Sequence, residues 1–233
     1  MISQRILTFA TAVVLLFVAC PVLFPAALPP FPLLQSADLI EFGAPFVIVP
    51  LYWWMFDGAG VGAPERRQVV VFILFTTLWV IGVGTHLAGN SIQHLMDQGG
   101  AGAPAYELAR FYHKPLSHYV QSIGLIGLAT ALIHRESVQG STGERDGLWL
   151  EGLAAVFYGF AFFCLHVSGR IAPIGIAYSL AVAVYGVVQW TRIRHRPVLA
   201  FFLMSQTLNL VLCIGWAIHW DGMPNFSETG IIK

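Results

Sequence analysis

The residues best suited to chemistry lie in one stretch, His86-Leu-Ala-Gly-Asn90-Ser91-Ile-Gln-His94-Leu-Met-Asp97, which closes a long apolar run. On an α-helix of about 3.6 residues per turn, the spacing i, i+4, i+8 and i+11 puts the two histidines, Asn90 and Asp97 on one face. Imidazoles and carboxylates without thiolates are ligands for zinc, iron, manganese or copper. The stretch therefore predicts one wall of a polar or metal-binding site.

The composition indicates a polytopic membrane protein. Hydrophobic residues make up 57% of the 233 residues and charged residues only 10%, with a mean hydropathy of +0.71, whereas soluble domains carry about 25% charged residues. The formal net charge is zero and no basic block occurs, so nucleic-acid binding has no electrostatic basis. Cys20, Cys164 and Cys213 stand singly in apolar runs, so we expect neither a disulfide framework nor a thiolate metal site.

Seven segments have the roughly 20 mostly apolar residues that a spanning helix needs. We therefore expect an all-α, single-domain bundle (1–233) of seven transmembrane helices. Pro45 and Pro50 interrupt the second segment, which membrane helices tolerate. The first segment is expected to be a retained helix, because no clear small-residue cleavage site precedes its prolines. The expected spans are 6–27, 37–56, 67–92, 109–133, 148–168, 171–191 and 198–220.

Arginine and lysine are distributed unequally between the two sets of connecting segments. Eight fall on the side of the N-terminus and four on the other side. Because cytoplasmic loops carry the excess of these residues, the N-terminus is expected in the cytoplasm and the C-terminus outside. The short loops favour a bacterial inner membrane, with the site facing the periplasm or exterior. Arg135, Arg194 and Arg196, beside His134 and His195, are expected to form a solvated basic rim on the cytoplasmic side.

This topology brings six of the eight histidines to the outer half of the bundle. Ionisable groups inside a membrane are costly and are normally paired or functional, so the two histidines deepest in their apolar runs, His86 and His166, are the best candidate ligands. We expect a metal centre built from these two and one or more of His94, His118 and His219. His113 is a further candidate.

His113 and His118 flank Pro115 at the start of the fourth expected span. Five residues apart on a regular α-helix, the two histidines are rotated by about 140° from each other and cannot face one centre. Pro115 disturbs the backbone around it. His113 could therefore belong to a loop that leads into the helix and bends inward.

Other polar groups would complete the chemistry. Glu41 or Asp97 is expected to act as a further ligand or as general base toward a metal-bound water. Asn90 and Ser91 would orient ligands or stabilise an oxyanion. The tail after Asp221 has two interpretations, a lid folded over the outer mouth or a frayed terminus.

Asn90-Ser91 followed by His94 and Asp97, in a seven-helix topology with His219 in the last helix, resembles the alkaline ceramidase and progestin/adiponectin-receptor superfamily. The resemblance implies a zinc-dependent membrane hydrolase that cleaves a lipid amide at the membrane surface. The chain departs from the pattern in two places. Ser91 stands three residues before His94 where the family has four, and the last helix lacks an HxxxH pair.

Two other functions use the same residue types. A di-iron oxidase or hydroxylase would need a spacing other than the usual HxxxH and HxxHH boxes, and a haem-binding electron carrier would use His86 and His166. A transporter is disfavoured, because the cytoplasmic half offers little polar path beyond Glu151 and Gln206. The sequence thus favours a metal-dependent membrane enzyme, with zinc before iron, copper or haem, acting on a lipid or amphiphile. It leaves the substrate and the oligomeric state open.

Overall fold

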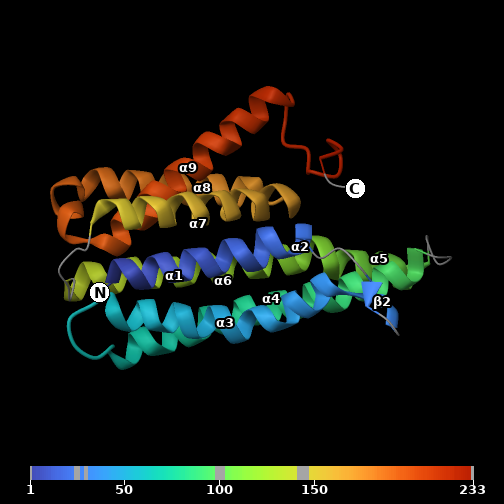
Figure 1. Ribbon diagram of the computed structural model, residues 1–233, viewed down its shortest axis with the longest axis horizontal. Helices are drawn as coiled ribbons and strands as arrows, with labels where there is room; N and C mark the ends of the chain where they lie inside the picture. The colour runs from blue at the N-terminus through green and yellow to red at the C-terminus, as the bar shows by residue number, and fades with distance from the viewer. Residues whose placement is uncertain (1, 24–26, 29–30, 98–102, 141–146, 232–233) are drawn as a thin grey trace.

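The computed structural model describes residues 2–23, 27–28, 31–97, 103–140 and 147–231. Long helices run side by side along one axis (Figure 1). Between the first two of them, a short antiparallel hairpin joins β1 (Ala27–Leu28) to β2 (Phe31–Gln35). The helical elements are α1 (Ile2–Val14), η1 (Leu15–Ala19), α2 (Cys20–Leu23), α3 (Ser36–Gly58), α4 (Arg66–Asp97), α5 (Pro104–Phe111), η2 (Tyr112–Leu116), α6 (Ser117–Gln139), α7 (Leu148–Ser168), α8 (Ala172–Val188), η3 (Trp190–His195) and α9 (Pro197–His219).

The expectation of an integral membrane protein agrees with the helix lengths. In the described part of the chain, six helical stretches are long and apolar enough to cross a membrane. The segment expected as the sixth span, 171–191, contains α8, which is apolar but has only 17 residues. The six stretches are Ile2–Ala19, Ser36–Gly58, Arg66–Gln93, Pro104–Gln139, Leu148–Ser168 and Pro197–His219.

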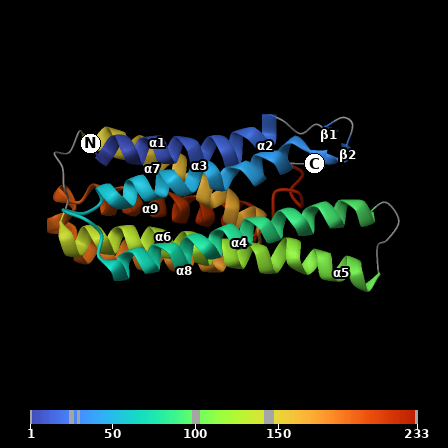
Figure 2. The same ribbon diagram turned by 90° about the horizontal axis from the view of Figure 1, so that it is seen from below.

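The long helices alternate in direction, so the bundle has two chemically different ends (Figures 1 and 2). The N-terminus lies at one end, which we call the arginine end after Arg135, Arg192, Arg194 and Arg196. The C-terminal tail lies at the opposite end. We call this the histidine end, after His86, His113, His118 and His166.

Glycines let α4 and α6 pack closely, which sets the distance between the histidines that the two helices carry. A Cβ added at Gly124 of α6 would lie 2.6 Å from the backbone nitrogen of Trp79 in α4, and one at Gly82 would lie 2.6 Å from the backbone nitrogen of Gln121. Small residues at such contacts are how membrane helices bring their backbones together. The pairing fixes α4 against the segment that follows Pro115.

Pro115 does not break the helix, contrary to the expectation of a loop at His113. Residues Pro104–Gln139 form one helical stretch, and Pro115 lies within the π-helical turn η2, where the Ser117 N–H donates to the Tyr112 carbonyl five residues earlier. The expected start of this span at 109 was therefore too late. Membrane helices absorb a proline through such local adjustments, and α3 likewise continues through Pro45 and Pro50.

The solvated rim expected at the arginine end was wrong for Arg135. This side chain is fully buried, and its guanidinium donates to the carbonyls of Phe56 (2.7 Å) and Gly62 (2.7 Å) and to Oε1 of Gln68 (3.1 Å). The chain between α3 and α4 turns at this position, and the guanidinium donates to carbonyls on both sides of the turn. His134 and His195 are exposed, as expected.

Glu136, next to Arg135, is also fully buried. Its two carboxylate oxygens accept the backbone N–H groups of Val198 (2.9 Å) and Leu199 (2.8 Å). These are N–H groups of the first turn of α9, which have no partner within their own helix. Glu136 therefore joins α6 to the start of α9.

Candidate histidine site

The centre of the histidine end is a pair formed by His86 of α4 and Glu41 of α3. Nδ1 of His86 lies 2.6 Å from Oε1 of Glu41, and the two side chains are 20% and 19% exposed. A carboxylate at Nδ1 favours the tautomer that carries its proton there, and it leaves the lone pair of Nε2 directed away from the carboxylate. The pair therefore orients the ring of His86 as a base or ligand.

Two further imidazoles surround His86. Its ring centroid lies 4.7 Å from that of His113 and 4.9 Å from that of His118, with interplanar angles of 64° and 60°. The π-helical turn between them explains how both reach one centre. Its hydrogen bonds join residues five apart, which brings such residues onto one face, whereas an α-helix separates them by about 140°.

Gln93 is a functional candidate that the sequence reasoning missed. Its Oε1 lies 2.7 Å from Nδ1 of His113, so the amide orients this ring as Glu41 orients His86. The signal was present in the spacing. Gln93 follows His86 by seven residues, close to two full turns, whereas His94 at i+8 is rotated by about 80° from it.

His166 of α7 is fully buried, and its ring is close to a helix backbone. Its Nδ1 donates to the Phe162 carbonyl at 2.7 Å. A Cβ at Gly175 of α8 would lie 2.5 Å from its Cδ2, and one at Gly169 would lie 3.0 Å from Cγ of His118. Glycine at these two positions makes room for the two rings.

Two buried imidazole nitrogens have no hydrogen-bond partner among the described residues, Nδ1 of His118 and Nε2 of His166. Leaving such an atom unsatisfied costs about 1–3 kcal/mol. Folded proteins contain few of them, and each calls for an explanation such as a bound ion, a water or a catalytic role. The histidine end thus holds two ring nitrogens that no described residue satisfies.

The other predicted site residues are placed differently. Asn90 donates from Nδ2 to Oδ1 of Asp38 at 3.3 Å, and Ser91 donates from Oγ to the carbonyl of Leu87 at 3.0 Å. In this arrangement the Ser91 hydroxyl proton is engaged within its own helix. The role predicted for Ser91 as an oxyanion donor would require its side chain to rotate.

His219 does not share the site. Its side chain is exposed at the end of α9, with its ring 4.9 Å from that of Trp220. The backbone of α4 includes His94 and Asp97, but the side chains of these two predicted residues lie outside the described part of the structure. The residues that the structure brings together are Glu41, His86, His113 and His118, with His166 nearby.

A pocket of about 250 Å³ opens beside the cluster. Its wall combines the histidines with two cations and with the C-terminal tail. The lining residues are His86, His113, Lys114, His118, Ser168, Gly169, Arg170, Asn225, Phe226 and Ser227.

The tail, residues 221–231, folds back from the end of α9 toward the bundle (Figure 1). Nε1 of Trp216 donates to the carbonyl of Pro224 at 2.9 Å, and the ring of Phe226 lies 5.1 Å from Trp216 and 5.9 Å from Phe163. Glu228 forms an ion pair with Arg170. Of the two interpretations of the tail, a lid agrees with these contacts and a frayed end does not.

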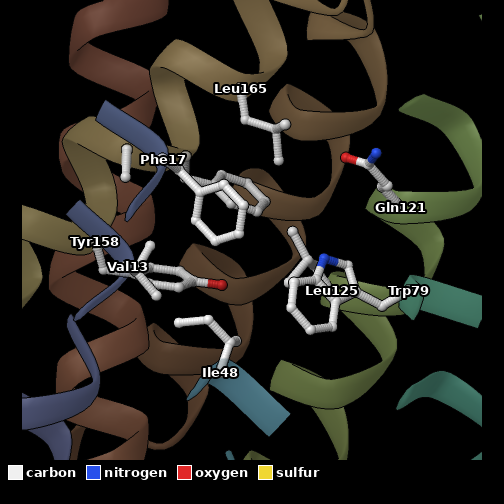
Figure 3. Close-up of a pocket in the computed structure, with 10 residues that line it drawn as sticks. Val13, Phe17, Ile48, Trp79, Gln121, Leu125, Tyr158 and Leu165 are labelled. Atoms are coloured by element: carbon white, nitrogen blue, oxygen red, sulfur yellow. The ribbon is translucent and has the colours of Figure 1, made fainter. Parts of the chain in front are cut away.

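A narrow apolar cavity of about 50 Å³ lies deeper between the helices. Figure 3 shows the amide of Gln121 and the hydroxyl of Tyr158 among its mostly apolar walls. Gln121 follows His118 by one helical turn, and Leu165 precedes His166. The cavity therefore adjoins the histidines from the side of the membrane interior. Its lining residues are Val13, Phe17, Ile48, Trp79, Gln121, Leu125, Tyr158, Ala161, Phe162 and Leu165.

The donor set fits a transition metal in chemistry. Two imidazoles bound tetrahedrally to one zinc ion through nitrogens at about 2.1 Å have ring centroids about 5 Å apart, which is close to the separations of His86 from its two neighbours. Among the described residues, however, no three His, Cys, Asp or Glu side chains stand around a common point that would hold a metal ion. Convergence on one ion would require rotations of these side chains.

No protein-family model, curated protein or solved structure matches this chain. The resemblance to the alkaline ceramidase and progestin/adiponectin-receptor superfamily therefore stays a prediction. What the chain can do rests on its own residues: a helical, membrane-spanning scaffold that gathers oriented imidazoles at one end.

Proposed function

We propose that this protein is an integral-membrane, metal-dependent enzyme that hydrolyses a lipid or another amphiphile at its histidine end. One observation carries the proposal. The rings of His113 and His118 lie within 5 Å of His86, and Nδ1 of His86 and of His113 is held by Glu41 and Gln93. Carboxylates and amides in this position are typical partners of metal-binding histidines.

His86, His113 and His118 would hold the metal, and zinc is the ion that we propose. When bound, zinc would supply a Lewis acid that polarises a carbonyl and activates water. Glu41 holds the proton at Nδ1 of His86 and acts as a positioning residue. His166, whose Nε2 is buried beside the cluster without a described partner, is a candidate to accept or return a proton.

The two cavities support an amphiphilic substrate. The pocket beside the histidines is lined largely by polar side chains, while the deeper one is apolar and reaches into the membrane-spanning region. A short hydrocarbon segment in the deeper cavity, which has only about 50 Å³, would direct the attached polar group toward the imidazoles. With α8 as a seventh crossing, an N-terminus in the cytoplasm and a bacterial inner membrane, this end would face the exterior.

The test is the metal content of the purified full-length protein. We expect about one equivalent of zinc in the wild type and its loss in His86→Ala and His118→Ala, since a catalytic zinc keeps about three protein ligands. His219→Ala is the matched control, because this histidine is at the same end but exposed and apart from the cluster. Thermal unfolding of each variant checks that metal loss does not follow from misfolding.

The outcomes discriminate between functions. Wild-type protein without metal after expression with added zinc would overturn the enzyme proposal. Iron or copper in place of zinc would favour the oxidase. A haem absorbance lost in both His86→Ala and His166→Ala would replace the hydrolase by an electron carrier.

A further inference from the structure

We propose that the pocket beside the histidines binds a phosphate group through Lys114 and Arg170, and that the substrate is therefore a phosphate-bearing amphiphile. The inference depends on the proposed function in one respect, namely that the bound phosphate compound is the substrate of the enzyme. The anion site is argued from the charges around the pocket, and it can be tested on protein without metal.

Lys114 of η2 and Arg170, which follows α7, stand together on one wall. Both line the histidine pocket, and both also line a neighbouring pocket of about 420 Å³. Of the described side chains that line the histidine pocket, none is a carboxylate. Glu41 lies behind the ring of His86, at its Nδ1. The pocket therefore presents two permanent cations and imidazole groups to whatever enters it.

Arg170 reaches this wall through an unfavourable backbone. Its φ is 55°, in the left-handed region that residues other than glycine seldom adopt. This single residue turns the chain from α7 into α8 and puts the guanidinium at the pocket. The conformation is that of a helix C-cap, in which the Ile171 N–H donates to the His166 carbonyl at 3.0 Å.

The tail already places an anion at this cation. Glu228 pairs with Arg170, and its other oxygen accepts the backbone N–H of Asn225 at 2.9 Å. The two side chains are 60% and 45% exposed, so the pair contributes little to stability and can be exchanged at low cost. A phosphate would compete well, because it offers more charge and three acceptor oxygens to the planar fork of an arginine.

The experiment measures binding to the full chain, purified in a neutral detergent and stripped of metal. The probes are inorganic phosphate, and phosphatidic acid or phosphatidylcholine in mixed micelles. We expect saturable phosphate binding that weakens about tenfold in Lys114→Gln and Arg170→Gln, the loss expected for a charge-assisted contact. Arg192→Gln is the control, since this arginine is exposed at the opposite end.

Glu228→Gln is expected to change phosphate affinity in the opposite direction. Removing the competing carboxylate should tighten phosphate binding about threefold, because phosphate no longer displaces an ion pair. No gain in this variant would overturn the role of the tail as competitor. Phosphatidic acid bound more tightly than inorganic phosphate would identify a lipid headgroup, and the reverse order would identify a soluble phosphate compound.

The anion site is overturned if inorganic phosphate does not saturate and phosphatidic acid binds no better than phosphatidylcholine. It is also overturned if Arg192→Gln weakens binding as much as Arg170→Gln. Phosphate binding by a chain that takes up no metal would sink the proposed enzyme but leave the anion site standing. The two proposals therefore fail separately.

Discussion

Two pairs of residues, Arg135 and Glu136 at one end of the bundle and His118 and His166 at the other, differ in how their buried polar atoms are satisfied. At the arginine end, Arg135 donates to three carbonyls and a glutamine, and both oxygens of Glu136 accept backbone N–H groups. At the histidine end, His118 and His166 each keep a buried nitrogen without a described partner. The hydrogen-bonded side chains of Arg135 and Glu136 indicate a structural role. The unpartnered nitrogens of His118 and His166 are consistent with a site that binds an ion, a water molecule or a ligand.

The contrast has an energetic meaning. Moving a polar group out of water is unfavourable wherever it happens, and hydrogen bonds must offset the loss. Arg135 and Glu136 make those bonds, whereas one nitrogen of His118 and one of His166 lack them among the described residues; Oε1 of Gln139 at the arginine end also lacks a partner. A protein retains buried polar groups without hydrogen bonds where function requires them, at the expense of stability. Substitutions at the two ends should therefore differ in what they damage.

The largest loss of stability is expected for Arg135→Ala. It removes the hydrogen bonds that the guanidinium donates to the carbonyls of Phe56, Asp57 and Gly62 and to Gln68, and breaking a buried charged network costs about 4 kcal/mol. Chemical unfolding in detergent micelles measures this loss, with the exposed Arg192→Ala as control, expected within about 0.5 kcal/mol of the wild type. If Arg135→Ala lowers stability no more than its control, Arg135 does not have the structural role assigned to it here.

Glu136→Ala is expected to cost about 2 kcal/mol, because two N–H groups in the first turn of α9 lose their acceptor. The same unfolding measurement applies. Metal content should be unchanged in the folded fraction, since Glu136 is at the arginine end. Loss of metal without loss of stability would contradict its assignment as a structural residue.

Gly175→Ala should act on the histidine end. The added Cβ would lie 2.5 Å from Cδ2 of His166, so the ring must move, at a net cost of about 1 kcal/mol after the gain in helix propensity. We expect activity on an amphiphilic substrate to fall more than stability does. Gly84→Ala is the matched control, because no atom lies within 4 Å of its added Cβ; equal effects of the two would argue against His166 as part of the site.

The smallest change in stability is expected for His118→Leu. Replacing this half-buried imidazole, whose buried Nδ1 has no described partner, by an apolar side chain should leave the free energy of unfolding unchanged or raise it by about 1 kcal/mol, while bound metal is lost. His134→Leu, an exposed position on the same helix, should change neither quantity. A strong destabilisation by His118→Leu would show that this ring is structural.

Hydropathy was enough to predict most of the fold. Six of the expected spans are confirmed as helices long and apolar enough to cross a membrane, because a run of about 20 apolar residues has few other solutions. The topology expected from the sequence also placed Glu41 and the histidines at one end of the bundle. It could not show that Glu41 meets His86, because the rotation of a helix about its own axis is set by packing and not by hydropathy.

Two errors have the same physical origin. Arg135 resembled a solvated rim residue because nothing local shows that the chain between α3 and α4 turns across it. The π-helical turn at Pro115 could not be predicted either. A proline in the sequence indicates that regular hydrogen bonding is interrupted, but not how the backbone compensates. In both cases the deciding contacts come from parts of the chain that are distant in sequence or from backbone geometry.

The turn η2 has a consequence for what sequence change the site can withstand. It holds one residue more than an α-helical turn would need, and this extra residue puts His113 in phase with His118. Deleting one residue from 114–116 would restore a regular α-helix and leave the two histidines four residues apart, a spacing that keeps them on one face. If η2 became a regular α-helix without a deletion, the rings would be rotated apart by about 140°. The site therefore depends on a match between the number of residues separating its imidazoles and the backbone geometry of the turn that joins them.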